Sequence, residues 1–241
     1  MQIKHMQEFS GNTYMLPHLL AGQYVLTSIR CDTPVGVLYE ATQKDTQREV
    51  LVHSLHAGLA LDTSICNTFI EDARACSRVQ MPFVSTVIEL LPADETWHLV
   101  LEGNGTDSLD FAAAAKQSIT CADMVGLLQK IGKLCLHLDA ESINSRPFHL
   151  SGLYRHGKHY LMDNPACSGQ RSPFESNRYV IAAAKALLPL LENGQGEDVV
   201  AVRRMMQRIA DMPDSCGIVA AEMLCELARV PVLQHEDEFI L

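Results

Sequence analysis

The regular pattern of the chain begins at residue 22 with a series of short strands. β-branched and aromatic residues dominate three segments, and short polar connections separate them. Segments of this kind, joined by short turns, are typical of an antiparallel meander. The three expected strands are 23–29, 37–41 and 49–55.

A helix is expected next, because apolar positions recur every three or four residues between residues 68 and 79. Pro82 ends this helix. Two further strands are predicted at 86–91 and 97–101. Residues 22–103 are therefore expected to be strand-rich, with one helix inserted after the third strand.

The second half of the chain is predicted to be mainly helical. Thr120 is a candidate N-cap, with Asp123 as its capping-box partner three residues later, and an apolar stripe follows as far as residue 138. The other expected elements are a hairpin within 152–162 and helices at 178–192, 201–210 and 218–230.

Composition and charge exclude several classes of protein. The chain has 241 residues, of which 47% are hydrophobic and 20% charged, as is typical of a globular protein. Its net charge of −10 disfavours binding to a phosphate backbone, which needs clustered cations. The first ten residues lack the apolar stretch of a signal peptide, and the longest apolar region, 179–191, is too short to span a bilayer. We expect neither nucleic acid nor a membrane as a partner.

The eight cysteines are scattered and none has CxxC spacing. In a chain of this length they indicate buried thiols in a reducing compartment, rather than a disulfide framework or a zinc site. Three of them fall in helical apolar patterns, namely Cys76, Cys135 and Cys225. The chain is therefore expected to be cytoplasmic.

Seven short stretches, taken in order, resemble motifs of one family. They are 36–41 (GVLYEA), 50–53 (VLVH), 69–74 (FIEDAR), 99–102 (LVLE), 162–165 (MDNP), 172–175 (SPFE) and 220–224 (AAEML). Together with the order of the elements they resemble the protein kinase fold, most closely the bacterial Ser/Thr kinases of the eukaryotic type.

This resemblance covers roughly residues 22–231 and implies an α+β, two-lobed fold. A small N-lobe with a five-stranded antiparallel sheet and one helix is expected at 22–103. A shortened, mainly helical C-lobe is expected at 104–231. Residues 1–21 are then a tail or arm, and 232–241 an acidic C-terminal tail.

The residues that would handle phosphate in a kinase depart from the family pattern. Of the Gly-rich loop only the third glycine, Gly36, is present, because Cys31 and Thr33 occupy the first two positions. His53 stands where the family has a lysine, and a neutral imidazole supplies no permanent charge. The acid of the N-lobe helix maps to Asp72, which either contacts His53 or lies on a solvated helix face.

The catalytic loop departs further. Arg146 aligns with the catalytic Asp and Ser151 with the Mg²⁺-binding Asn. An arginine cannot accept a proton, and serine is a poor Mg²⁺ ligand. A shift in alignment does not help, because no Asp or Glu lies between Ile143 and Met162. Asp163 keeps the metal-binding carboxylate, which either holds Mg²⁺–ATP weakly or braces the turn after the hairpin.

The segment that follows Asp163 is also altered. Asn164 and Pro165 replace the Phe and Gly of the family motif, and proline removes backbone flexibility. Cys216 stands where bacterial relatives place an Arg that pairs with the acid equivalent to Glu175, so that ion pair is expected to be lost. The vestigial cleft is thus expected to contain Gly36, His53, Asp72, Leu101, Arg146, Ser151 and Asp163.

These departures predict a pseudokinase that binds another protein as a scaffold or regulatory module. It is expected to have no catalytic residue, no metal site and no cofactor beyond weakly bound ATP. The alternative is a nucleotide-binding switch that uses the cleft without phosphoryl transfer. An enzyme that transfers another group from ATP would need a base that the sequence does not provide, and a different α+β domain would lack the five-stranded lobe.

Overall fold

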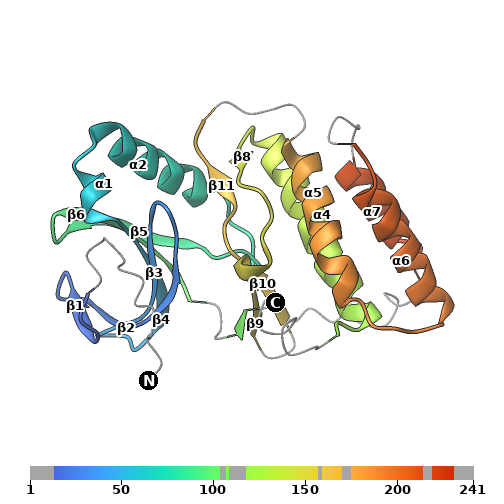
Figure 1. The fold of residues 1–241 in the computed structure, drawn as a ribbon, viewed down its shortest axis with the longest axis horizontal. Coiled ribbons are helices and arrows are strands. Elements are labelled where there is room, and N and C mark those ends of the chain that lie inside the picture. Colours follow the sequence, from blue (N-terminus) through green and yellow to red (C-terminus); the bar gives the residue numbers. More distant parts are fainter. Residues whose placement is uncertain are drawn as a thin grey trace, which may run out of the picture. The chain divides into compact units, whose positions relative to one another are not determined.

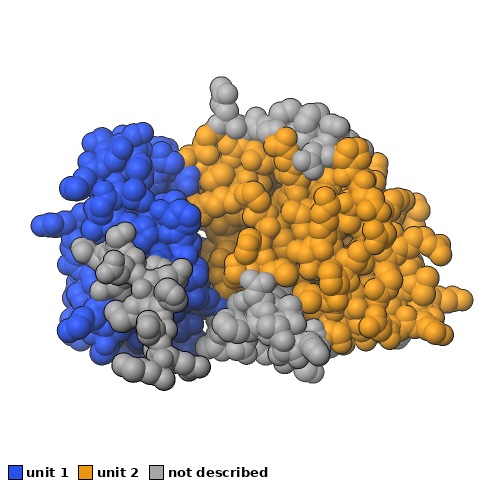
Figure 2. Space-filling model, in the orientation of Figure 1, with its two compact units in different colours: residues 1–74, 86–103 blue, residues 75–85, 104–241 orange. Residues whose placement is uncertain are grey.

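A computed structural model describes residues 14–103, 107–108, 118–156, 159–169, 175–213 and 219–230, and the chain forms two compact units (Figure 1). Unit 1 comprises residues 1–74 and 86–103, and unit 2 comprises residues 75–85 and 104–241 (Figure 2). Residues 75–85 thus lie within the strand-rich part of the sequence but pack with unit 2.

Unit 1 is built on one antiparallel sheet of six strands in the order β1-β2-β3-β4-β6-β5. All five predicted strands are present, with ends that differ by a few residues from those expected. The strands are β1 (His18–Leu20), β2 (Tyr24–Asp32), β3 (Gly36–Gln43), β4 (Glu49–Leu55), β5 (Val87–Ala93) and β6 (Thr96–Glu102).

The sixth strand, β1, lies in the segment that was expected to be a tail. Leu20 pairs with Tyr24, and the turn between them places Ala21 and Gly22 at positive φ. Alanine rarely adopts this conformation, and the strand is only three residues long, so the sequence carried little signal for it. The expected five-stranded sheet therefore has an additional edge strand.

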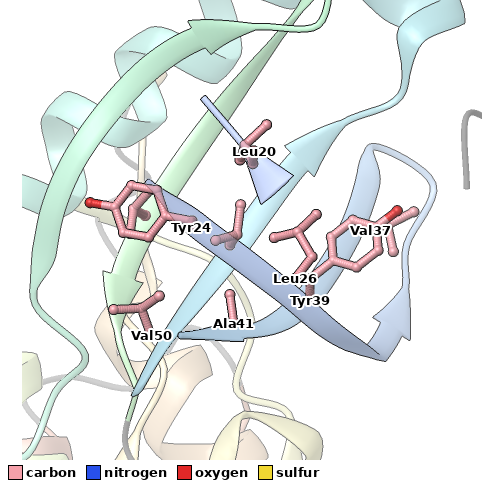
Figure 3. Packing of buried hydrophobic residues seen from close by; sticks show 9 residues of the cluster. Leu20, Tyr24, Leu26, Val37, Tyr39, Ala41 and Val50 are labelled. Atoms are coloured by element: carbon pink, nitrogen blue, oxygen red, sulfur yellow. The ribbon is translucent and has the colours of Figure 1, made fainter. Parts of the chain in front are cut away.

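Both faces of the sheet are buried. On one face, alternate residues of β3 and β4 such as Val37, Tyr39 and Val52 join an apolar cluster (Figure 3). On the other face, Leu38 and Leu51 pack in a second cluster with residues of α2. Burial on both faces explains why β3 contains three consecutive apolar residues, 37–39, rather than an alternating pattern.

The sheet is curled, as is shown by contacts between side chains from strands near opposite ends of the strand order. The Tyr24 hydroxyl on β2 donates a hydrogen bond to Glu89 on β5, although these strands are far apart in the strand order. His18 of β1 lies 3.0 Å from the carboxylate of Asp94, just after β5. Tyr14 stacks on His18 and packs against the first apolar cluster, so the residues before β1 cover part of this face.

Helix α2 (Thr63–Ser77) begins five residues earlier than the apolar pattern predicts, and a short helix, α1 (Ala57–Ala60), precedes it. The Asp62 side chain accepts hydrogen bonds from the backbone N–H groups of Ser64 and Ile65. This is the hydrogen bonding of an N-cap, which satisfies donors that the first helical turn leaves open.

Unit 2 is organised around helix α4 (Cys121–Ala140), whose apolar stripe is fully buried. The predicted cap is confirmed, since the Thr120 side chain accepts from the backbone N–H of Asp123. Gly132 allows α7 to approach closely, because a Cβ there would lie 2.8 Å from Leu224 Cγ. The other helices are α5 (Glu175–Leu187), η2 (Leu188–Leu190), α6 (Glu197–Ala210) and α7 (Val219–Leu227).

Short strands complete unit 2. The predicted hairpin is confirmed as β9 (Leu153–His156) and β10 (His159–Met162), with β7 (Asp107–Ser108) alongside β9. The 3₁₀ turn η1 (Leu150–Gly152) leads into the hairpin. A two-stranded ladder joins β8 (Asn144–Ser145) to β11 (Ala166–Cys167).

The described cysteines are not joined in disulfides. Cys76, Cys121 and Cys135 are buried, as expected of structural thiols, whereas Cys225 lies exposed on α7 and was wrongly assigned to an apolar stripe. Within the described ranges, no helix is long and apolar enough to cross a bilayer, and no three or more His, Cys, Asp and Glu side chains form a group that could hold a metal ion.

The buried imidazole of His98 makes the stability of unit 1 depend on pH. Its side chain is 0% exposed, Nε2 donates to the Ala93 carbonyl at 3.0 Å, and Nδ1 accepts from the Ser54 hydroxyl at 2.8 Å. Burial lowers the pKa of His98, an effect that the neighbouring Ala93 carbonyl and Asp94 oppose and His18 adds to.

Because the folded state holds His98 neutral, the unfolded chain binds the extra proton below pH of about 6.5. The free energy of unfolding should therefore fall with decreasing pH below that value, by up to about 1.4 kcal/mol per pH unit. Urea unfolding followed by the fluorescence of Trp97, the single tryptophan, measures this. His98→Gln keeps a donor and an acceptor but does not titrate; an equal slope in this variant would contradict the assignment.

Candidate functional site

The turn between β2 and β3, where the resemblance places a phosphate-binding loop, is closed by its own hydrogen bonds. The Thr33 hydroxyl donates to the Gly36 carbonyl at 2.7 Å and accepts from the Gly36 N–H at 3.1 Å. It also accepts from the Val35 N–H at 3.4 Å, while the Thr33 N–H donates to the Gly36 carbonyl at 3.0 Å. Pro34, the remaining residue of the turn, has no N–H.

A phosphate is cradled by backbone N–H groups that point outward from a loop. In the turn from Thr33 to Gly36 each available N–H is directed into the turn itself. These residues therefore do not fit the triphosphate that the fold would otherwise lead one to expect.

His56, directly before α1, is bonded to this turn through its side chain and its backbone. Its Nε2 lies 2.9 Å from the Thr33 carbonyl and 3.3 Å from the Asp32 carboxylate, and its backbone N–H donates to the Val35 carbonyl at 3.1 Å. Sequence reasoning missed this cluster, because its members are separated by more than twenty residues. The only local signal was a histidine directly after a strand.

Gly36 is required by the sheet. It pairs with Leu55, and a Cβ at this position would lie 2.1 Å from the Ser54 carbonyl oxygen. The glycine that matches the family motif is therefore explained by the close approach of β4.

His53 and Asp72 both lie in unit 1. The His53 ring, on β4, packs at 5.4 Å from the ring of Phe69 on α2. Asp72 is half-buried on the same helix, three residues further on. The contact between Asp72 and His53 stays a prediction. Leu101 is buried on β6 in the cluster that faces α2.

In unit 2 the structure brings the positions of Ser151 and Asp163 together. The Asp163 N–H donates to the Gly152 carbonyl at 2.7 Å, and a Cβ on Gly152 would lie 3.3 Å from Asp163 Oδ2. The Ser151 hydroxyl lies 2.6 Å from His149 Nδ1, within the same 3₁₀ turn. The Asp163 side chain thus packs on the 3₁₀ turn before the hairpin, and the expected bracing of the turn after the hairpin stays a prediction.

Arg146 is bonded to the segment that contains Asp163, and Tyr179 is influenced by the Asp163 carboxylate. Arg146 is exposed, and its backbone N–H donates to the Pro165 carbonyl at 2.7 Å, so the two segments are joined through their backbones. Burial raises the pKa of Tyr179, and Cys135 and Asp163 add to this effect. The Asp163 carboxylate therefore lies within electrostatic reach of a buried phenol.

Asn164, which replaces the Phe of the family motif, is a buried structural residue. Its side chain amide donates to the Cys76 carbonyl at 2.8 Å, and its Oδ1 accepts from the Ala166 N–H at 3.2 Å. The sequence showed an unusual polar residue here but gave no indication of its partners.

Some of the expected positions fall outside the described residues. These are residues 172–174 of the SPFE stretch, Cys216, and the tails at 1–13 and 232–241. Glu175 begins α5, and the expected loss of its ion pair stays a prediction.

Comparisons with known proteins assign the fold. No protein-family profile and no curated protein matches the sequence. A crystal structure of the PknI kinase domain from Mycobacterium tuberculosis matches with a TM-score of 0.65 and 11% identity, covering 90% of this chain and 99% of that one. A second crystal structure of that domain gives a TM-score of 0.66 at 11% identity, covering 90% and 100%.

The chain has a protein kinase-like fold. An identity of 11% carries the architecture but not the activity, so the chemistry of this kinase-like chain is argued from its own residues.

The close contact at Gly36 gives a direct test of its structural role. Gly36→Ala forces a methyl group against the Ser54 carbonyl, and we expect it to lower the free energy of unfolding of unit 1 by about 3 kcal/mol. Urea unfolding followed by Trp97 fluorescence measures the loss.

Gly58→Ala is the matched control in the same unit, because a Cβ there meets nothing within 4 Å. This helical position should be unchanged or up to about 1 kcal/mol more stable. If Gly36→Ala were as stable as the control, the packing role of Gly36 would be wrong.

Proposed function

We propose that this chain is a pseudokinase, a kinase-like domain that does not transfer phosphate and acts by binding another protein in the cytoplasm. The observation that carries the proposal is the lack of any Asp or Glu between Ile143 and Met162. Phosphoryl transfer to a hydroxyl needs a residue there that orients the nucleophile and accepts its proton. Arg146 can do neither.

The phosphate-binding elements support the same proposal. The N–H groups of the turn from Thr33 to Gly36 are engaged within the turn, and His53, half-buried against Phe69, replaces the lysine. Catalysis of phosphoryl transfer rests on positioning and charge neutralisation, so losing both sets of contacts removes its main sources.

Protein recognition is the function that remains for this fold. The net charge of −10 disfavours nucleic acid, and among the described residues the large apolar side chains of Met15 and Leu61 are 92% and 89% exposed. Affinity capture of the intact protein from its native cytoplasm, followed by rebinding of each captured protein in purified form, identifies the partner.

The lack of phosphoryl transfer is tested with the purified full chain. Incubation with Mg²⁺, γ-labelled ATP and a generic protein substrate should give no more label, on the substrate or on the chain, than the Asp163→Ala variant gives. An active kinase run in parallel shows that the assay works. Incorporation that Asp163→Ala abolishes would refute the proposal, and an intact-mass increase of another size would point to transfer of a different group from ATP.

Nucleotide titration separates a scaffold from a nucleotide-binding switch. For a scaffold, the melting temperature should stay constant as ATP or ADP is raised to millimolar concentration with Mg²⁺. A bound nucleotide would stabilise the fold by about 1.4 kcal/mol for each tenfold rise in concentration above its dissociation constant. A rise of this form, lost in Asp163→Ala, would favour the switch.

A further inference from the structure

Each residue of the segment 162–167, which runs from the end of β10 to the end of β11, is hydrogen-bonded to other parts of unit 2. Met162 donates to the Phe83 carbonyl at 2.8 Å and accepts from the Ser85 N–H at 2.9 Å. Asp163 and Pro165 are joined to Gly152 and Arg146 as described above, and the ladder between β11 and β8 holds the last two residues, 166 and 167. The backbone of this segment is thus fixed on both sides of Asn164.

Asn164 adds bonds that a backbone cannot make. Its side chain is 6% exposed, and its Nδ2 donates to the carbonyl of Cys76 at 2.8 Å and to that of Ser85 at 3.4 Å. Its Oδ1 accepts from the Ala166 N–H at 3.2 Å. The amide therefore joins the segment before β5, the last turn of α2 and the start of β11.

The carbonyl of Cys76 belongs to the last turn of α2 and accepts a hydrogen bond from the Val79 N–H at 3.1 Å. The Asn164 amide is a second donor to this carbonyl and links it to the segment after β10, a bond that the phenylalanine of the family motif could not make. The Cys76 thiol donates a hydrogen bond to the Ala166 carbonyl at 3.2 Å, so each of the two segments donates a side-chain hydrogen bond to the backbone of the other.

We propose that Asn164 is a positioning residue that holds residues 75–85 and 162–167 in one permanent arrangement. The inference rests on the proposed function and concerns its regulation: these two segments keep the same arrangement with and without nucleotide, so nucleotide does not switch them. Buried hydrogen bonds oppose rearrangement, because each bond broken leaves a desolvated polar group.

Hydrogen exchange of the full chain, measured by mass spectrometry, tests this. In the unmodified protein, amides of 75–85 and 162–167 that are hydrogen-bonded should exchange as slowly as those in the core of α4, with the same rates when Mg²⁺–ATP is present. Asn164→Leu keeps a side chain of similar size without the amide, and should accelerate exchange in both segments by about tenfold or more.

Asn177→Leu is the matched control, because Asn177 is also a buried amide of unit 2, at 9% exposure, and its Oδ1 accepts from the Val219 N–H at 3.2 Å. It should loosen the start of α7 and leave residues 75–85 unchanged. If hydrogen exchange in residues 75–85 were accelerated equally in both variants, the cause would be general destabilisation, and the positioning role of Asn164 would be overturned.

The measurement on the unmodified protein decides the matter even where Asn164→Leu does not fold. Fast exchange in 162–167, or protection that changes when Mg²⁺–ATP is added, would overturn the inference. If the chain transfers phosphate while both segments stay protected, only the pseudokinase proposal is refuted. If the chain is inactive but the segments are unprotected, only the positioning role of Asn164 is refuted.

Discussion

A backbone N–H that already donates a hydrogen bond inside the chain is not free to bind an anionic ligand, and this constraint shapes both parts of the candidate site. In unit 1 the turn from Thr33 to Gly36 uses its N–H groups to close itself. In unit 2 the segment from Met162 to Cys167 uses its polar groups to join neighbouring segments. Each region thus satisfies its own backbone N–H groups within the folded chain, which leaves fewer of them for a ligand.

Much of the fold could be predicted because its signals are local. The strands of unit 1 and the stripe of α4 follow hydrophobic periodicity, and Thr120 is a cap that depends on residues only three positions apart. What failed depended on distant contacts. Strand β1 is held by pairing to β2 and by His18 near Asp94, 76 residues away, and no periodicity in three residues can reveal either.

The candidate site divides in the same way. The sequence placed Ser151 and Asp163 in one cleft, and in the structure the Asp163 N–H donates to the carbonyl of Gly152, the residue after Ser151. It did not indicate that His56 would close the turn at Thr33, or that Asn164 would reach the last turn of α2, because such bonds join strands and helices that only tertiary packing brings together.

Agreement with a motif and agreement with its chemistry are separate matters in this chain. Gly36 is the residue that the family motif has at this position. A Cβ here would lie 2.1 Å from the Ser54 carbonyl oxygen, and this contact explains the glycine without any ligand. Asn164 replaces the phenylalanine of the family motif, yet its buried amide gives the segment hydrogen bonds that an aromatic ring could not make. At both positions the residue is explained by its contacts within the fold, so agreement or disagreement with the family motif does not by itself decide which chemistry the chain performs.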